Sequence, residues 1–185
     1  AIKLADGVPT GILKKRLFTK DKKVNLGHAV FKTEMTRLLN STTTQDKSYP
    51  LSLVSQRELR SQNTWLHNVA KLVVTDRVQR LRIHPDDAEK YGIADGDVVE
   101  ISSRHGQILV PSALVTDEMM PGTLALPHGW GHEGGWQRAV AMGGGGYNQL
   151  TTNSAESADL PSGNATVNGI SVKIRAVKNV EKVAV

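Results

Sequence analysis

Short apolar runs separated by turn-forming residues follow one another closely between residues 49 and 177. In "YPLSLVSQ" (49–56), Leu51 and Leu53 fall on one side of a strand, and "AKLVVTDRVQRLRI" (70–83) continues with strand-like residues. Many short strands at close spacing, with little helix between them, indicate a small closed barrel. Further strand candidates are "VVEIS" (98–102), "ILVPSALV" (108–115), "LALP" (124–127) and "NGISVKIRAV" (168–177).

One short helix is predicted inside "LRIHPDDAEKYGIADGDVVEIS" (81–102). Pro85 suits the first turn of a helix, because its missing N–H would have no partner there. Asp86 and Asp87 place negative charge at the positive end of the helix dipole, and Gly92 can take the left-handed conformation that closes a helix. We therefore expect a strand, a short helix, a tight turn and a second strand.

The first 48 residues differ in character from the rest of the chain. The basic stretch "GILKKRLFTKDKKVNLG" and the polar stretch "NSTTTQDKS" flank a weakly helical segment at 28–40. We interpret residues 1–48 as an arm or interdomain linker, which either packs on another structure or is a frayed terminal extension. Residues 49–185 form the predicted domain. Within the helical segment, the residues spaced to share one face are Val30, Met35, Leu38 and Leu39.

Length and composition limit the function. A chain of 185 residues can bury a core but is too short for a large multistep enzyme. Its net charge of +5 favours anionic partners such as nucleotides, phosphates or acidic protein surfaces. The absence of cysteine excludes disulfides, iron–sulfur ligation and a cysteine nucleophile within the chain. Spacing yields no nucleophile–base pair, and we expect neither a membrane span nor a complete active site.

A dense set of hydrogen-bonding residues follows the first predicted strand, in "QRELRSQNTWLHN" (56–68). A solvated turn would explain its charges. The run of uncharged amides and hydroxyls is more typical of a surface that binds a polar heterocycle. The candidates are Arg57, Glu58, Ser61, Gln62, Asn63 and Thr64.

The segment 127–151 holds eight of the chain's 17 glycines and two of its three tryptophans. Glycine permits close backbone approach, and exposed N–H groups can bind anions, so this composition suits a loop that covers a ligand. A flexible exposed loop is the alternative. The spacing of His128, His132 and Glu133 is a weak match to a metal site, because the intervening glycines disfavour a helix. "GGGG" (143–146) lacks the Lys-Ser or Lys-Thr of a phosphate-binding loop.

Together these residues resemble the C-terminal domain of the dimethyl sulfoxide reductase and formate dehydrogenase superfamily of molybdenum and tungsten oxidoreductases. The resemblance spans about residues 49–177, and its most specific parts are "PDDAEKYGIADGDVVEIS", "PGTLALPHGWG" and "YNQLTT". It implies a six-stranded double-psi β-barrel, mainly β with short helices, that caps a funnel holding molybdopterin guanine dinucleotide (bis-MGD) with Mo or W. The isolated domain is expected to bind no cofactor by itself, because it forms only one wall of the site.

The resemblance also implies the cofactor-binding residues. "SQRELRSQNT" is similar to the first cofactor loop of the family, "PHGWG" to a second, and Asn148 and Thr151 match its Asn-x-Leu-Thr element. The partners implied are the remaining catalytic domains of the same enzyme, whether this chain is an excised domain or a separate subunit. The set is Arg57, Glu58, Ser61, Gln62, Asn63, Thr64, His128, Gly129, Trp130, Asn148 and Thr151, and of these we expect Arg57, Gln62, Asn63 and Asn148 to line one surface.

Two other classes share features with the chain. The pattern Gly-Ile-x-x-Gly-Asp-x-Val also resembles the protein-binding barrels of Cdc48-type ATPases, but those have no need of the loop at 127–151. The charge of +5 is compatible with nucleic-acid binding, yet aromatic residues are few and the basic residues concentrate in the arm, so we expect no nucleic-acid partner. We expect a cytoplasmic location in a bacterium, with a periplasmic one left open.

Overall fold

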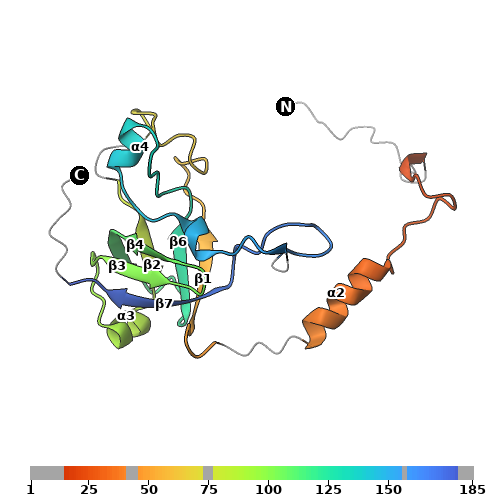
Figure 1. Ribbon diagram of the computed structural model, residues 1–185, viewed down its shortest axis with the longest axis horizontal. Helices are drawn as coiled ribbons and strands as arrows, with labels where there is room; N and C mark the ends of the chain where they lie inside the picture. Colours follow the sequence, from red (N-terminus) through yellow and green to blue (C-terminus); the bar gives the residue numbers. More distant parts are fainter. Residues whose placement is uncertain (1–14, 41–45, 73–76, 156–157, 179–185) are drawn as a thin grey trace, which may run out of the picture. The chain divides into compact units, whose positions relative to one another are not determined.

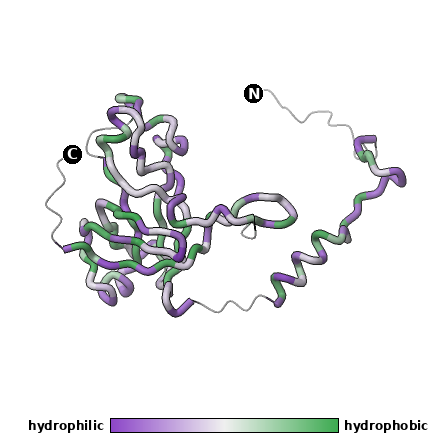
Figure 2. The backbone as a smooth tube through the Cα atoms, viewed as in Figure 1, coloured by the Kyte–Doolittle hydropathy of each residue, from purple (hydrophilic) through white to green (hydrophobic). Residues whose placement is uncertain are grey.

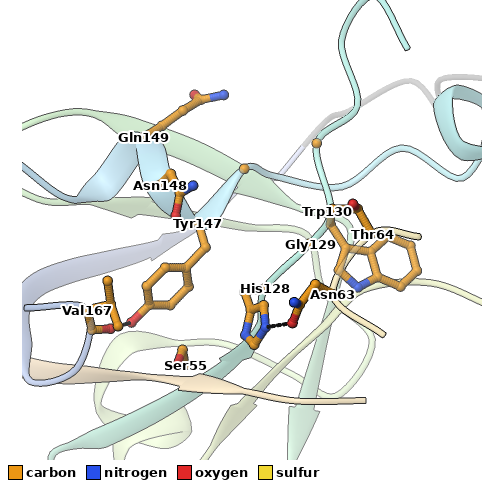
Figure 3. Close-up of a pocket in the computed structure, with 12 residues that line it drawn as sticks. Ser55, Asn63, Thr64, His128, Gly129, Trp130, Tyr147, Asn148, Gln149 and Val167 are labelled. Carbon is orange, nitrogen blue, oxygen red and sulfur yellow. Dashed lines mark hydrogen bonds between the residues drawn. The ribbon is translucent and has the colours of Figure 1, made fainter. Parts of the chain in front are cut away.

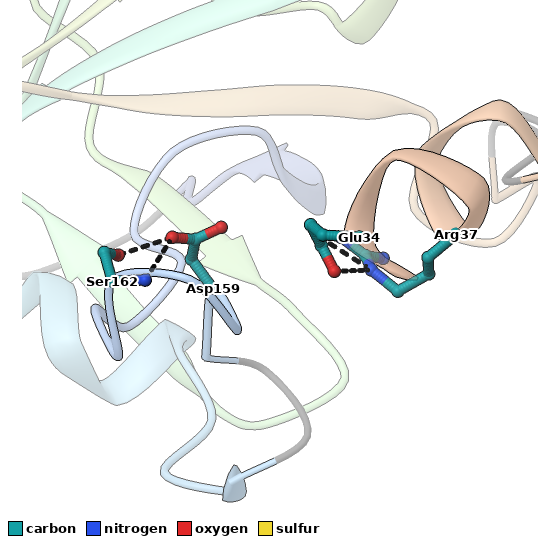
Figure 4. A network of polar contacts seen from close by, with 4 residues as sticks. All are labelled: Glu34, Arg37, Asp159 and Ser162. Carbon is teal, nitrogen blue, oxygen red and sulfur yellow. Dashed lines mark hydrogen bonds and ion pairs between the residues drawn. The ribbon is translucent and has the colours of Figure 1, made fainter. Parts of the chain in front are cut away.

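The computed structural model describes residues 15–40, 46–72, 77–155 and 158–178 (Figure 1). The chain divides into two units, residues 1–42 and 43–185. In the first unit, helix α2 (Ala29–Asn40) confirms the helix expected there. Its Met35, Leu38 and Leu39 side chains are 62%, 56% and 82% exposed. Glu34 accepts hydrogen bonds from Arg37 one turn later (Figure 4).

Seven strands form one mixed sheet in the second unit, in the order β4-β3-β7-β1-β6-β2-β5. Strand β1 runs parallel to β6 and strand β2 parallel to β5, whereas the other neighbours are antiparallel. The mainly β prediction is confirmed. The strands are β1 (Leu51–Gln56), β2 (Arg80–Ile83), β3 (Val99–Ser102), β4 (Gln107–Val110), β5 (Ser112–Val115), β6 (Thr123–Pro127) and β7 (Ile170–Ala176).

The strand count differs from the six strands that the resemblance implies. Pro111 splits the predicted run 108–115 into β4 and β5, which pair with different neighbours. Proline has no N–H to donate to a sheet, so a chain commonly leaves one pairing there and enters another. Among the described residues, β4 and β5 are not paired with each other, and the closed barrel of the prediction is therefore not established by strand pairing.

Alternation of apolar residues along the strands builds the core. Leu51 and Leu53 of β1 are 3% and 0% exposed, as expected from their spacing. In Figure 2 apolar residues gather along the strands of the sheet, whereas apolar and hydrophilic residues alternate along α2. The fully buried residues of the core cluster come from all seven strands and from the loop that follows β6: Leu53, Leu81, Ile83, Val99, Ile101, Val110, Ala113, Leu124, Leu126, Leu150 and Val172.

The strand predicted at 70–83 is correct only for its last four residues. Residues 70–72 lie in turns, since the N–H of Leu72 donates to the carbonyl of Val69 at 2.9 Å instead of to a neighbouring strand. Residues 73–76 lie outside the described part of the chain. At 70–72 local turns therefore take the place of the predicted strand.

Helix α3 (Pro85–Tyr91) confirms the helix predicted there. The His84 Nδ1 atom accepts a hydrogen bond from the N–H of Asp86 at 3.1 Å, and Gly92 closes the helix with φ of 63°. The buried Asp87 carboxylate accepts from the N–H of Gly122 at 2.6 Å. This bond fastens α3 to the turn that leads into β6, so the helix is part of the scaffold.

The register of β1 and β6 positions the two loops that matter most. Their last residues, Gln56 and Pro127, face each other across a parallel pair. Both strands therefore end at the same edge of the sheet, and the loops that leave them start side by side. The second loop includes the short helices α4 (Gln137–Ala141) and η1 (Tyr147–Leu150).

Candidate functional site

A cavity of about 470 Å³ opens where β1 and β6 end (Figure 3). Three loop segments make most of its wall: residues 63–64, 128–131 and 146–149. Ser55 and Val167 complete it. The loops therefore converge on one polar hollow at the carboxyl ends of two parallel strands, a common position for ligands in sheets of this kind.

The loop after β1 contacts the loop after β6 backbone to backbone. Gln62 and Asn63 both have positive φ, 42° and 60°, which turns the chain sharply at the cavity. The Asn63 Oδ1 atom lies 2.9 Å from His128 Nε2, so the amide accepts from the imidazole. Gly129 has φ of 89°, and a Cβ there would lie 2.1 Å from the Asn63 carbonyl oxygen. Only glycine fits this crossing.

The third segment is held just as closely. A Cβ on Gly131 would lie 2.4 Å from the N of Gly146, so these two backbones also touch. Next to them, the buried Tyr147 hydroxyl donates to the carbonyl of Val167 at 2.7 Å. Burial raises the pKa of the Tyr147 phenol to about 12, and it therefore stays protonated and neutral at the wall of the cavity.

A buried glutamine ties the cavity segments to the sheet. The Gln79 Nε2 atom donates to the carbonyls of Pro127 at 2.8 Å and Gly145 at 3.1 Å. Its Oε1 atom accepts from the N–H of Gly145 at 2.7 Å. Gln79 is 0% exposed and immediately precedes β2, so one side chain satisfies three backbone groups of the loops from within the scaffold.

Trp130 forms one side of the cavity and is 4% exposed. Its Nε1–H donates to Glu58 Oε2 at 3.0 Å, and Arg77 pairs with the same carboxylate oxygen at 2.7 Å. The Arg77 guanidinium also lies 5.7 Å from the centre of the indole ring. The charges of Glu58 and Arg77 thus compensate each other behind the cavity wall.

The residues that line the cavity include no aspartate, glutamate, lysine or arginine. Their polar groups are amides, hydroxyls and backbone groups. Within the described part of the chain, the buried His128 Nδ1 and Gln56 Oε1 atoms have no hydrogen-bond partner. Such a donor and acceptor set fits a neutral polar heterocycle better than a phosphate.

The structure brings six of the predicted site residues together and separates five. Arg57 and Gln62 are exposed and do not line the cavity, so only Asn63 and Asn148 of the surface that we expected share it. Ser61 is buried, and Thr151 lines a separate hollow while its hydroxyl donates to the carbonyl of Asn148 at 2.9 Å. The six that meet are Asn63, Thr64, His128, Gly129, Trp130 and Asn148.

Sequence reasoning missed half of the lining residues. Tyr147 and Gln149 flank the predicted Asn148 and could have been included through the "YNQLTT" element. Ser55 and Val167 carry no chemical signal, because each reaches the cavity only through the pairing of β1 and the turn before β7. The missed residues are Ser55, Gly131, Gly146, Tyr147, Gln149 and Val167.

The histidines of this region have separate partners. His128 bonds to Asn63, whereas His132 Nε2 lies 2.8 Å from the Nδ1 atom of the buried His67. Among the described residues, no group of three His, Cys, Asp or Glu side chains is arranged to hold a metal ion. No helix in the same described part is long and apolar enough to cross a membrane.

The fold and the cavity together define a domain that presents a polar binding site on loops at one edge of a sheet. A model of the molybdopterin dinucleotide binding domain family matches residues 51–167. The chain belongs to this family, the molybdopterin dinucleotide binding domain of dimethyl sulfoxide reductase family enzymes. The match includes all three segments that line the cavity.

Several known proteins are similar to the chain. Trimethylamine-N-oxide reductase of Haemophilus influenzae is 40% identical over 100 residues, which are 52% of this chain and 11% of that protein. Dimethyl sulfoxide reductase DmsA of Escherichia coli is 36% identical over 107 residues, 58% of this chain and 13% of that protein. The chain therefore spans only about a tenth of the length of these relatives.

A solved structure supports the fold. Acetylene hydratase from Pelobacter acetylenicus superposes with a TM-score of 0.59 and 22% sequence identity, covering 70% of this chain and 18% of that chain. At this identity the likeness concerns the fold alone.

Proposed function

We propose that the chain binds molybdopterin guanine dinucleotide as the cap domain of a larger molybdenum or tungsten oxidoreductase. The observation that carries this proposal is the amide-rich cavity at the ends of β1 and β6, whose lining includes no Asp, Glu, Lys or Arg. The family match includes the loops that form it, which favours a cofactor domain over a protein-interaction barrel. The domain alone supplies a binding wall and no complete active site.

The cavity residues fit the uncharged part of such a cofactor. The amides of Asn63, Asn148 and Gln149 can each both donate and accept, which a pterin or guanine ring requires. The bound cofactor would supply the redox-active metal. A pyrophosphate needs cations or free N–H groups, and the expected cation Arg57 lies outside the cavity, so we place the phosphates beyond this wall.

The relatives favour one class of reaction for the whole enzyme. Both enzymes described above are named as reductases of trimethylamine N-oxide or dimethyl sulfoxide. We therefore propose an oxide reductase before the formate dehydrogenase-like activity that was also expected.

We further infer that the sheet closes into a double-psi barrel. Its two parallel pairs, β1 with β6 and β2 with β5, lie on either side of the antiparallel contact between β2 and β6. Two parallel pairs made by strands distant in sequence are what two interlocked crossovers produce. An experimental structure with hydrogen bonds joining the outer strands would support closure, and an open edge would argue against it.

Exposed tryptophans support the proposal that other domains complete the site. Trp65 and Trp136, on the two loops, are each 80% exposed, and Leu59 is 97% exposed. Asn68 Oδ1 accepts from the N–H of Ala139 at 3.0 Å, which joins these loops. Large exposed apolar side chains commonly mark an interface. We propose that the remaining catalytic domains of the same enzyme cover them.

We also propose a cytoplasmic location for the protein. Fractionation of cells would test this location.

The binding proposal is tested in the complete enzyme by removing two cavity amides. Asn63→Gly keeps the positive φ that position 63 requires, and Asn148→Ala removes the second amide. We expect this double variant to release the dinucleotide at least about tenfold faster, because two hydrogen bonds of about 1 kcal/mol each are lost.

The matched control is Asn153→Ala with Asn164→Gly, both at exposed positions outside the cavity. The control should release the guanine and pterin at the rate of the unmodified enzyme. Unchanged release from the Asn63 and Asn148 variant would overturn the proposal.

A further inference from the structure

A buried histidine lies at the centre of a hydrogen-bonded cluster behind the cavity. The cluster consists of Ser61, His67, Trp130 and His132, and it joins the loop after β1 to the loop after β6. His67 is 0% exposed and Ser61 is 1% exposed. Neither Ser61, His67 nor His132 lines the cavity, so none of them is placed to contact a ligand there.

Both ring nitrogens of His67 are engaged. Its Nε2 atom is hydrogen-bonded to the Ser61 hydroxyl, and its Nδ1 atom lies 2.8 Å from His132 Nε2. With the proton on Nδ1, His67 donates to His132 and accepts from Ser61, whereas the opposite tautomer reverses both bonds. A neutral His67 therefore makes both hydrogen bonds of the chain Ser61–His67–His132 with no charge on its own ring.

The electrostatic surroundings keep His67 neutral. Burial is the main cause that lowers the pKa of the His67 imidazole to about 4, and electrostatic interactions with His132 and Arg77 lower it further. The Glu58 carboxylate has other partners, since it pairs with Arg77 and accepts from Trp130. The cluster is thus set for hydrogen bonding and not for an ion pair.

The cluster acts on the cavity through Trp130. The His67 ring packs against the indole with a centroid distance of 5.0 Å, and Glu58 and Arg77 fix the indole from another direction. Trp130 stands between Gly129 and Gly131, whose backbones touch the other two cavity segments. The indole is therefore attached to the short piece of backbone that crosses both other segments.

We infer that His67 and His132 are positioning residues, whose shared hydrogen bond holds Trp130 and the 128–131 backbone in the shape that receives the cofactor. This inference rests on the proposed function of the cavity. It assigns a role to a histidine pair that spans 65 positions in sequence and lies outside the cofactor wall.

The test is the rate at which the complete enzyme releases its dinucleotide, measured by fluorescence of the released and oxidised pterin. His132→Leu removes the hydrogen bond to His67, whereas His132→Gln keeps a polar atom near the position of Nε2. We expect about five- to tenfold faster release from the leucine variant, the loss of one hydrogen bond, and near-normal release from the glutamine variant. His105→Leu, at an exposed position outside the cavity, should change nothing.

The variants separate the possible outcomes. Release from His132→Leu at the normal rate would overturn the inference, and so would equal acceleration by leucine and glutamine, because the hydrogen bond would then be irrelevant. If His132→Leu does not fold, His132→Gln and His67→Gln are compared, and the inference requires release to be faster for the latter, which keeps only one of two bonds. Release of the dinucleotide at the normal rate from the Asn63 and Asn148 variant would instead contradict the proposed function itself.

Discussion

The sheet and the loops at its edge are held together by different kinds of interaction. The sheet is held by apolar burial, with residues such as Leu53, Leu81 and Leu124 fully enclosed. The cavity loops are held by glycine crossings and by buried polar side chains, chiefly Gln79 and His67. Apolar burial stabilises without direction, whereas hydrogen bonds and close backbone contacts fix a shape. The sheet should therefore contribute most of the free energy of unfolding, and the loops should determine the shape of the binding cavity.

The largest expected effect breaks the sheet. Leu53→Ala removes a side chain that is 0% exposed from β1 and should lower the free energy of unfolding by about 3 kcal/mol, through lost burial and a residual cavity. Urea denaturation measures the change. Leu109→Ala, at a position 50% exposed, is the control and should cost less than about 1 kcal/mol. Equal losses would show that the sheet is not held by the burial described.

The second effect concerns the pH dependence of the loop cluster. The unfolded His67 takes up a proton near pH 6.5, but in the folded chain its pKa is lowered to about 4. Between these values the unfolded state binds more protons, so stability falls as the pH drops from 6.5 to 4, by up to about 3 kcal/mol from this group.

Replacement of this histidine isolates its contribution. His67→Asn should be less stable than the unmodified chain at pH 7 but should lose less stability on acidification. Urea denaturation at pH 7, 6, 5 and 4.5 compares the two slopes. Parallel slopes would mean that His67 titrates alike in both states.

The third prediction removes the hydrogen bonds that Gln79 makes between the sheet and the loops. Gln79→Leu fills the same buried space but leaves the N–H of Gly145 and the carbonyl of Pro127 without their partner. We expect a loss of about 2 kcal/mol from these unsatisfied groups. Gln107→Leu, exposed on β4, should be nearly neutral in the same denaturation experiment. A neutral Gln79→Leu would mean that the loops hold their position without this side chain.

The last prediction contrasts two glycines, of which Gly134→Ala carries the smallest expected loss of stability. Gly129→Ala and Gly134→Ala both place a side chain at positive φ, 89° and 72°, and this backbone conformation alone costs about 1 kcal/mol at each position. Only at Gly129 would the new Cβ meet another backbone, whereas nothing lies within 4 Å at Gly134. In the complete enzyme, Gly129→Ala should therefore lose dinucleotide and Gly134→Ala should retain it. Similar dinucleotide contents in the two variants would show that binding does not depend on the backbone crossing at Gly129.

The same two regions differ in how far the sequence predicts them. The strands and α3 follow from alternation and from Pro85 and Gly92, because burial and capping act on neighbouring residues. Splitting of the run 108–115 at Pro111 was harder to predict, since each half pairs with a distant strand. The wrong strand prediction at 70–72 has the same origin. Strand propensity does not show whether a segment will pair with a distant strand or form a local turn.

Composition located the site loops but could not say which of their residues share a wall. Asn63 and Asn148 meet because β1 and β6 end together and Gly131 touches Gly146, contacts that span tens of residues. Arg57 carries the obvious chemistry for a dinucleotide, yet it lies outside the cavity. The histidine pair could not be predicted from the sequence for the same reason, because His67 and His132 meet only in the folded chain.

The most direct test of the central claim is an experimental structure of the complete enzyme with its dinucleotide bound. We predict that the amides of Asn63 and Asn148 lie within hydrogen-bond distance of one heterocycle, with the phosphates outside this wall. A dinucleotide whose phosphates fill the cavity, or whose rings lie in the separate hollow beside Arg104 and Thr151, would contradict it.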